Sequence, residues 1–371
     1  RRIVLATNVA ETSITVPGIR YVIDTGVARI SRYSVRTKVQ RLPIEAISQA
    51  SANQRKGRCG RVSNGICIRL YSEDDFLSRP EFTDPEILRT NLAAVILQML
   101  QLRIGDIHKF PFVDPPDSRQ INDGFKMLEE LHAVDGRKRL TQDGRRLAQL
   151  SVDPQLARML LAADKLGSVE EVMIIVSALS VQDPRERPAE KKQAADQQHK
   201  RFADDHSDFV AYVNLWHYFE QQRQALSQNQ LRKLCKKEFL AFMRMREWRD
   251  IHRQLKLAAK KLGLTFNREP ANYEAVHRAL ITGLLGNIGC HDEGREYLGA
   301  RNRKFAIFPG SSQQKKRPKW LVAAQLLETS QLFAHDVAKV EPEWLLQAAE
   351  HLVKRNYFEP YYDPKAGQVK A

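Results

Sequence analysis

The chain has 371 residues, with 59 Lys and Arg against 44 Asp and Glu, which gives a formal net charge of +15. A cationic excess of this size favours a polyanionic partner, nucleic acid first and an acidic membrane surface second. No membrane-spanning helix is expected, because the sequence contains no run of eighteen apolar residues. The length allows two to four domains, and a structural nucleic-acid-binding protein fits this composition as well as an enzyme does.

Cysteine usage argues against a metal or disulfide framework. Cys59, Cys67, Cys235 and Cys290 are scattered and form no CxxC pair. We therefore expect no zinc site and assign no metal ligands. Free thiols suit a reducing compartment, so a cytoplasmic location is expected.

Two apolar runs near the start, 3–6 and 19–23, have the length and continuous hydrophobicity of buried parallel strands. The polar segment between them carries too many hydroxyl groups to lie in a core. Ligands of open α/β sheets bind at the carboxyl ends of the strands. Thr7, Asn8 and Asp24 follow these strands and are therefore candidate ligand contacts.

Alternating residues in 27–30 and 38–42 predict a β-hairpin over about 27–47, and a further strand is predicted at 65–72. The hairpin carries basic side chains that no nearby acids balance: Arg29, Arg32, Arg36, Lys38 and Arg41. Contact with nucleic acid is the favoured interpretation, and an ordinary solvated hairpin with one charged face is the alternative.

The segment 51–61 reads SANQRKGRCGR and is the most densely basic part of the chain. A glycine inside a helix costs about 1 kcal/mol against alanine. The sequence therefore predicts a short helix that ends near Gly57 and presents Arg58 and Arg61 from a tight turn. Guanidinium groups held this way suit phosphate oxygens. Gln54, one turn earlier, is placed to orient a water molecule. A solvated basic loop is the alternative for this segment taken alone.

Apolar spacing predicts helices at 86–102, 118–132 and 143–150, with a turn in AVDGRKRLT between the second and third. Helix, helix, hairpin and helix is the order of a winged helix. Such a module could read DNA by itself or serve as a packing hub, and the family resemblance described below implies the second.

The segment 153–264 is predicted to be helical. Ser168 and Glu171 have the spacing of a capping box before an apolar run. An aromatic stripe within 209–219 predicts core packing in preference to base stacking. Residues 230–261 predict a basic amphipathic helix or helix pair suited to phosphate contact.

The last hundred residues are predicted to change from helix to strand. The expected elements are a helix at 271–286, strands at 303–308, 320–327 and 331–340, and a closing helix at 342–352.

Two of these stretches together resemble motifs of a known family. TNVAETSIT at 7–15 and QRKGRCGR at 54–61 are similar to motifs V and VI of the DEAH-box helicases, and the later sequence looks most like the bacterial HrpA-type branch. The resemblance implies ATP hydrolysis coupled to movement along RNA through two RecA-like domains. Neither GxxxxGK[ST] nor DEAH occurs in the chain. The resemblance therefore implies a piece that begins within the second RecA-like domain.

The resemblance implies roles for individual residues. Arg58 and Arg61 match arginine fingers at the γ-phosphate, Gln54 matches the residue that positions the attacking water, and Asp24 matches a nucleotide contact. The implied RNA contacts are Thr7, Asn8, Arg36, Lys38, Arg41, Arg301, Arg303 and Lys304. ATP and Mg²⁺ would be bound mainly by residues outside this chain, so the chain alone is expected to bind RNA without hydrolysing ATP.

The expected fold is multidomain, α/β plus α plus β. Residues 1–78 would form half of a RecA-like domain with a partial parallel sheet and the β-hairpin, 79–151 a winged helix, 152–268 a helical ratchet bundle, and 269–371 an OB-fold with a C-terminal tail. The expected partner is single-stranded RNA or a duplex with a single-stranded tail, and no protein partner is indicated. A non-catalytic RNA-binding scaffold and a DNA helicase remain the alternatives.

Overall fold

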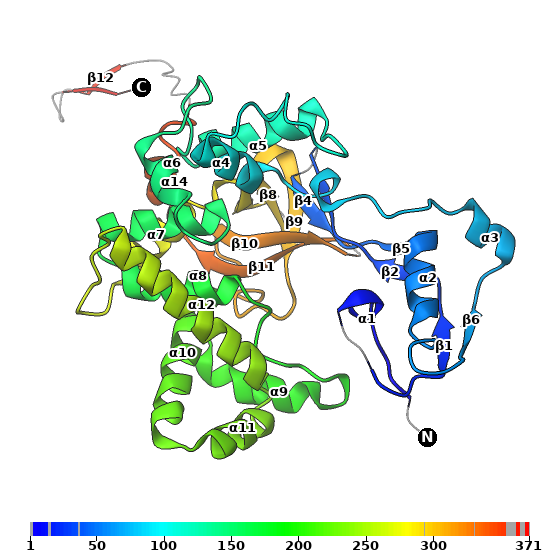
Figure 1. Cartoon of the computed structure of the whole chain (residues 1–371). Helices are drawn as coiled ribbons and strands as arrows, with labels where there is room; N and C mark the ends of the chain where they lie inside the picture. The colour runs from blue at the N-terminus through cyan, green and yellow to red at the C-terminus, as the bar shows by residue number, and fades with distance from the viewer. Residues whose placement is uncertain are drawn as a thin grey trace. The chain divides into compact units, whose positions relative to one another are not determined.

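The computed structural model describes residues 3–13, 16–35, 38–292, 294–329, 331–353, 361–363 and 368–370. The chain divides into two compact units, and each is described by itself (Figure 1). The first unit comprises Arg1–Met127 with Leu326–Phe333, and the second comprises Leu128–Gln325 with Ala334–Ala371.

A pair of parallel strands and one helix form the centre of the first unit. Strand β1 (Tyr21–Asp24) pairs with β6 (Ile66–Arg69), from Tyr21 opposite Ile66 to Asp24 opposite Arg69. Helix α2 (Gln49–Gly57) packs beside β1 (Figure 1). The strands predicted at 19–23 and 65–72 are therefore confirmed with shifted ends, and they are parallel neighbours of each other.

The predicted burial of the first two apolar runs is wrong. Ile23 on β1 is 67% exposed, and Ile3 and Leu5 are 92% and 94% exposed. Residues 3–6 form no strand, because no strand of the described residues offers them a hydrogen-bonding partner. A continuous apolar run indicates that a segment tends to be buried. It does not show that another strand lies beside the segment to form hydrogen bonds with it.

The basic hairpin exists with a different register from the predicted one. Strands β2 (Val27–Arg29) and β5 (Ile44–Ala46) pair antiparallel, and further out β3 (Arg32–Ser34) pairs with β4 (Val39–Arg41). The predicted pairing of 27–30 with 38–42 is wrong. Pro43 has no N–H to donate, so it interrupts the returning strand and splits it into β4 and β5.

The remaining elements of the first unit are short, and one predicted helix is divided. They are α1 (Val9–Thr12), α3 (Glu73–Ser78), the 3₁₀ turn η1 (Glu86–Leu88), α4 (Ala93–Leu102) and α5 (Ser118–Glu130), whose end crosses into the second unit. The helix predicted at 86–102 breaks after η1. The side chain of Asn91 accepts a hydrogen bond from the Ala93 N–H at 2.8 Å and starts α4 there.

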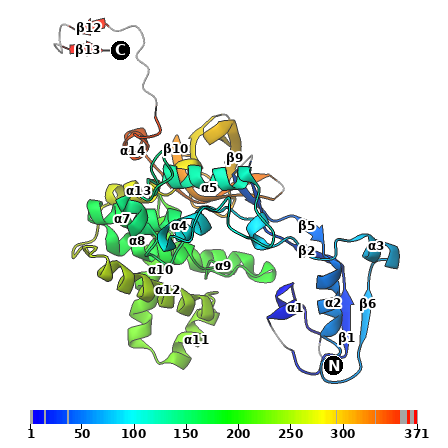
Figure 2. The ribbon, with the colours of Figure 1, turned by 45° about the horizontal axis from the view of Figure 1, so that its top comes forward.

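Helices dominate the second unit, as predicted for 153–264. They are α6 (Gln142–Leu147), α7 (Pro154–Leu166), α8 (Val169–Leu179), η2 (Ala189–Lys191), α9 (Lys192–His199), η3 (Lys200–Phe202), α10 (Asp208–Ala225), α11 (Gln228–Lys237), α12 (Phe242–Lys261), α13 (Tyr273–Ile281) and α14 (Pro342–Ala348). Helix α8 packs against α7, α10 and α12 (Figure 2). The predicted turn before α6 is an isolated bridge between Val134 and Leu140.

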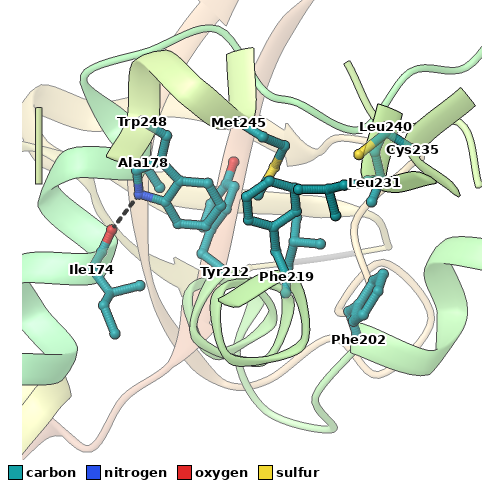
Figure 3. Close-up of a cluster of buried hydrophobic side chains, with 11 residues drawn as sticks. Ile174, Ala178, Phe202, Tyr212, Phe219, Leu231, Cys235, Leu240, Met245 and Trp248 are labelled. Carbon is teal, nitrogen blue, oxygen red and sulfur yellow. Dashed lines mark hydrogen bonds between the residues drawn. The ribbon is translucent and has the colours of Figure 1, made fainter. Parts of the chain in front are cut away.

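The aromatic stripe on α10 lies in the core, which confirms the predicted packing (Figure 3). Phe209, Tyr212 and Phe219 are at most 3% exposed. Trp248 on α12 is fully buried in the same cluster as Tyr212 and Phe219, and its indole N–H donates to the Ile174 carbonyl at 3.1 Å and to the Ser177 hydroxyl at 3.0 Å. The indole N–H is therefore satisfied inside the core.

The predicted capping box at α8 is wrong. The Ser168 hydroxyl donates to the Ala275 carbonyl, and Glu171 accepts from the Asn267 side chain and the Ala271 N–H. The Asn267 side-chain oxygen accepts from the Glu170 N–H at 3.0 Å. A residue about a hundred positions away thus supplies the cap that the local pattern assigned to Ser168.

The strands of the second unit form an antiparallel sheet. They are β7 (Ile288–His291), β8 (Glu296–Gly299), β9 (Arg303–Ile307), β10 (Trp320–Glu328) and β11 (Leu332–Lys339), with 3₁₀ turns η4 (Leu285–Asn287) and η5 (Ala300–Asn302) and a separate pair β12 (Tyr361–Asp363) and β13 (Gln368–Lys370). Sequence reasoning missed β7 and β8. The ends of β10 and β11 belong to the first unit, where Leu327 and Glu328 pair with Gln40 and Arg41.

Asp208, the first residue of α10, binds the loop that follows β9. Its carboxylate accepts hydrogen bonds from the Ser312 N–H at 3.1 Å, from the Ser311 and Ser312 hydroxyls, and from the Val337 N–H of β11 at 3.0 Å. One carboxylate therefore joins the helical part of the second unit to its sheet.

The described residues offer neither a membrane-spanning helix nor a cluster of metal ligands. None of their helices is long and apolar enough to cross a membrane. They also contain no group of three or more His, Cys, Asp or Glu side chains placed to hold a metal ion.

Candidate functional site

Helix α2 places the three residues predicted to act at a phosphate. It begins after Ser48, whose hydroxyl accepts from the Ser51 N–H at 3.2 Å, and it ends at Gly57 as the sequence predicted. Gln54 and Arg58 are four residues apart and so share one face of the helix end. Arg61 follows in the next turn. Gln54 and Arg61 are exposed and Arg58 is half-buried.

Arg55, between these residues, points into the unit. Its Nε donates to Glu11 Oε1 of α1 at 2.8 Å, and its Nη1 donates to Asp24 Oδ1 at the end of β1, also at 2.8 Å. Both terminal nitrogens lie 3.3 Å from the Val27 carbonyl. The Arg55 side chain is only 16% exposed. This arginine is therefore held by internal acceptors.

Asp24 is the most enclosed residue of the site, at 1% exposure. Its carboxylate accepts from the Gly26 N–H at 2.9 Å, from Arg55 and from the Tyr71 hydroxyl at 2.8 Å. Burial favours the neutral acid, but the hydrogen bonds from Gly26, Arg55 and Tyr71 outweigh it and hold the pKa of Asp24 below its usual value. Burial and the bond to Asp24 raise the pKa of Tyr71 to about 12. Asp24 is thus a charged acceptor that organises its neighbours.

Gly26 and Arg79 complete this network. Gly26 has φ +74°, and a Cβ there would lie 2.5 Å from the Tyr71 ring, so a side chain is excluded both by backbone conformation and by space. The Arg79 guanidinium lies 3.9 Å above the Tyr71 ring centroid and donates to the Gly26 carbonyl at 2.7 Å. The end of β1 is therefore fixed from several sides.

Thr7 and Asn8, the predicted RNA contacts, are both exposed and lie just before α1. The Thr7 carbonyl accepts from the Ala10 N–H at 3.0 Å, and Asn8 is the N-cap of α1 without a side-chain capping bond. Glu11, which binds Arg55, is three residues after Asn8. The chain segment with the predicted RNA contacts is thus joined to the helix with the predicted phosphate contacts.

The predicted basic contacts on the hairpin are engaged with acids. Lys38 forms an ion pair with Asp123 of α5, which is 5% exposed. Arg41 pairs with Glu328 at 2.7 Å, where both side chains are about two-fifths exposed. Arg36 lies outside the described residues. Their proposed contact with RNA stays a prediction.

The three predicted cations of the second unit also have internal partners. Arg301 lies 4.0 Å from Glu130, and Lys304 lies 2.9 Å from Asp292 and 3.7 Å from Glu296. Arg303 donates to the Ala300 and Gly286 carbonyls at 3.1 and 3.0 Å. The Arg303 guanidinium therefore stabilises the backbone at Ala300 and Gly286. The Lys304 side chain lies at the surface, where it is 54% exposed.

Family models match three segments of the chain. A helicase conserved C-terminal domain matches residues 1–63, a ratchet-like helicase-associated domain matches 153–212, and an oligonucleotide/oligosaccharide-binding OB-fold matches 276–352.

Whole-chain relatives decide the family. The chain is 62% identical over 377 residues to "ATP-dependent RNA helicase HrpA" of Escherichia coli (strain K12), covering 100% of this chain and 29% of that protein. The chain is HrpA-like throughout. An HrpA homolog of Haemophilus influenzae is 62% identical over 378 residues, with the same coverage. A human protein named "Probable ATP-dependent RNA helicase DHX35" is 33% identical over 358 residues, covering 96% of this chain and 50% of that protein.

These matches confirm the resemblance to the HrpA-type DEAH-box helicases, and with it the predicted ratchet-like segment and OB-fold. The HrpA-like chain spans about three tenths of the HrpA proteins it matches and half of the human relative.

Sequence reasoning missed two residues of the candidate site, Arg55 and Glu11. Arg55 lies in the same motif as the predicted fingers, and a buried carboxylate such as Asp24 needs a cation. The spacing of Arg55, four residues after Ser51, could have indicated its role, because the two side chains then lie on the same face of α2. No comparable signal singles out Glu11.

Proposed function

We propose that the HrpA-like chain works as part of an ATP-dependent RNA helicase, in which Arg58 and Arg61 neutralise charge on the γ-phosphate and Gln54 orients the attacking water. The observation that carries this proposal is the contrast within α2. Arg55 is held inside by two carboxylates, while Gln54 near the end of α2 and Arg61 after it are exposed and Arg58 at the C-cap is half-buried. Because these contacts fix α2, they would hold the arginines in place before negative charge develops on the γ-phosphate in the transition state.

The residues present fit half of a nucleotide site. They offer guanidinium groups and an amide, which suit a triphosphate. Mg²⁺ and most of the nucleotide would be bound by residues outside this chain. The chain alone should therefore bind RNA without hydrolysing ATP. Asp24 would act on the nucleotide indirectly, by holding Arg55, and a direct contact stays a prediction.

The finer assignments belong to the same proposal. Thr7 and Asn8 would hold phosphates of single-stranded RNA, with electrostatic support from Arg36, Lys38, Arg41, Arg301, Arg303 and Lys304. The domain division at 78/79, 151/152 and 268/269, the RecA-like and winged-helix assignments, and a cytoplasmic location are proposed with it.

Substitution of Arg58 tests the function in the complete polypeptide. Removing an arginine finger should lower the ATP turnover rate about 10³-fold, equivalent to about 4 kcal/mol of barrier. RNA affinity should change by less than about twofold, since phosphate grip on RNA is assigned elsewhere. Lys56→Ala is the matched control, because Lys56 is an exposed cation two residues away on the same helix.

Three results would contradict the proposal. Equal loss of turnover and RNA affinity in Arg58→Ala would make the residue an RNA ligand. Unchanged turnover would favour a non-catalytic RNA-binding scaffold. Stimulation of turnover by DNA strands, and not by RNA of the same sequence, would favour a DNA helicase.

A further inference from the structure

Glu11 is the principal tie between α1 and α2. Its Oε1 accepts from Arg55 Nε at 2.8 Å, and its Oε2 accepts from the Ser51 hydroxyl at 3.1 Å. Ser51 and Arg55 are one helical turn apart, so the two carboxylate oxygens hold two successive turns of α2. Helix α1 contains no buried residue of its own. Its position therefore depends on the polar contacts that Glu11 makes.

Arg55 connects this tie to a fixed anchor. Its Nη1 is bound to Asp24, which also receives the Gly26 N–H and the Tyr71 hydroxyl. The side chains of Arg55, Glu11 and Asp24 are 16%, 11% and 0% exposed. Solvent screens such partly enclosed charges less than surface pairs, so the geometry of the cluster is strongly preferred.

The cluster of Glu11, Arg55 and Asp24 adjoins residues of the proposed function on two sides. On one side, Thr7 and Asn8 directly precede α1. On the other, Gln54 adjoins Arg55, and the Arg58 N–H donates to the Arg55 carbonyl at 3.1 Å. A displacement of α1 therefore acts on the guanidinium of Arg55, and through it on the helix end that carries Gln54 and Arg58.

We infer that Arg55 is a positioning residue, and that the Glu11–Arg55 pair couples RNA contact at Thr7 and Asn8 to ATP hydrolysis at Gln54, Arg58 and Arg61. The inference rests on the proposed function. Asp24 fixes one side of the guanidinium and Glu11 holds the other. RNA that fixes the position of the turn before α1 thereby fixes the orientation of α2. Without the Glu11 contact, RNA would still bind, but α2 would no longer respond to it.

The decisive variant is Glu11→Gln in the complete polypeptide, which keeps side-chain size and removes the charge. The first readout is the ratio of ATP turnover with saturating RNA to turnover without RNA. The second is the ratio of RNA affinities measured with and without a non-hydrolysable ATP analogue, because coupling between two ligands is reciprocal in binding. Both ratios should fall toward one, by about fivefold or more. Glu73→Gln is the matched control, since Glu73 is an exposed carboxylate on α3.

A double substitution tests whether the two residues act as one link. Arg55→Lys can reach one carboxylate at a time and should lower the same ratios. If Glu11 and Arg55 act through each other, adding Glu11→Gln to Arg55→Lys should change the ratios by less than about twofold, whereas independent effects would multiply. Thermal unfolding of each variant shows whether the fold is kept.

The outcomes separate this inference from the proposed function. Unchanged ratios in a folded Glu11→Gln protein would overturn the inference while the proposed function stands. Equal loss of turnover with and without RNA would also overturn it, since the residue would then serve the fold or the chemistry alone. Absence of any RNA-stimulated turnover in the unsubstituted protein would overturn both.

Discussion

Lys38, at the tip of the basic hairpin, forms an ion pair with the buried carboxylate of Asp123 on α5. The same carboxylate accepts from the Tyr33 hydroxyl at 2.9 Å and from the Asn91 side chain at 3.2 Å. The Lys38 and Asp123 side chains are 15% and 4% exposed. A cation that the sequence assigned to RNA therefore holds the hairpin to α5 within the first unit.

Loss of this pair should destabilise the protein measurably. Lys38→Met leaves Asp123 buried without its cation, and we expect the free energy of unfolding to fall by about 3 kcal/mol. Urea denaturation followed by circular dichroism measures this change. Arg119→Ala is the control on α5, because the Arg119 side chain is 89% exposed and its loss should cost less than about 0.5 kcal/mol. Unchanged stability with weakened RNA binding would show that Lys38 serves RNA alone.

Trp248 should be the most sensitive position of the helical core. Trp248→Ala removes a fully buried indole and should cost about 4 kcal/mol of unfolding free energy. Trp248→Phe keeps most of the volume but leaves the Ile174 carbonyl without the indole N–H, so about 2 kcal/mol is expected. Leu257→Ala on the same helix, where Leu257 is 66% exposed, should be nearly neutral. Equal costs for the Ala and Phe variants would mean that the hydrogen bond dominates over packing.

His277 should make the second unit sensitive to acid. Burial lowers the pKa of His277 to about 4, and its ring nitrogens lie 2.7 Å from the Tyr273 carbonyl and the Ser207 hydroxyl. A histidine whose pKa is lower in the folded state contributes stability above pH 6.5 that is lost as the pH falls toward 4. The loss should approach about 3 kcal/mol.

The measurement is the difference in unfolding free energy between the unsubstituted protein and His277→Phe across this pH range. Using the difference removes the opposite contribution of Asp336, whose pKa burial raises to about 6. A difference that stays constant from pH 7 to pH 4.5 would contradict the prediction.

Arg303 and Lys304 are neighbours with different expected effects. Lys304→Ala should weaken RNA binding severalfold and reduce the slope of log affinity against log salt by about 1, as for one lost phosphate contact. Arg303→Ala should instead lower stability by about 1–2 kcal/mol, because its guanidinium holds the Ala300 and Gly286 carbonyls. Titrations at several salt concentrations and thermal unfolding separate the two roles. An unchanged salt slope in Lys304→Ala would remove that residue from the RNA contacts.

Local chemistry allowed the sequence to predict much of this fold. The end of α2 follows from Gly57, and the buried aromatics of α10 follow from helical spacing. The split return strand at Pro43 could have been predicted from the missing N–H, but the exact register could not. Register depends on which strands meet, as the pairing of β2 with β5 shows.

The partners of charged residues were the part that sequence could not supply. Glu11 and Arg55 are 44 positions apart, and Lys38 and Asp123 are 85 positions apart. Nothing in the pattern of either segment identifies the other. The sequence thus predicted the cations of the candidate site as ligands for phosphate, while the structure shows that several of them also have carboxylate partners within the protein.

The carboxylate of Asp208 has a mechanical consequence. Because it joins the first residue of α10 to the 311–312 loop and to β11, any movement of the helix start relative to the sheet must break these hydrogen bonds. A displacement of α10 would therefore be passed through this one carboxylate to the 311–312 loop and to β11.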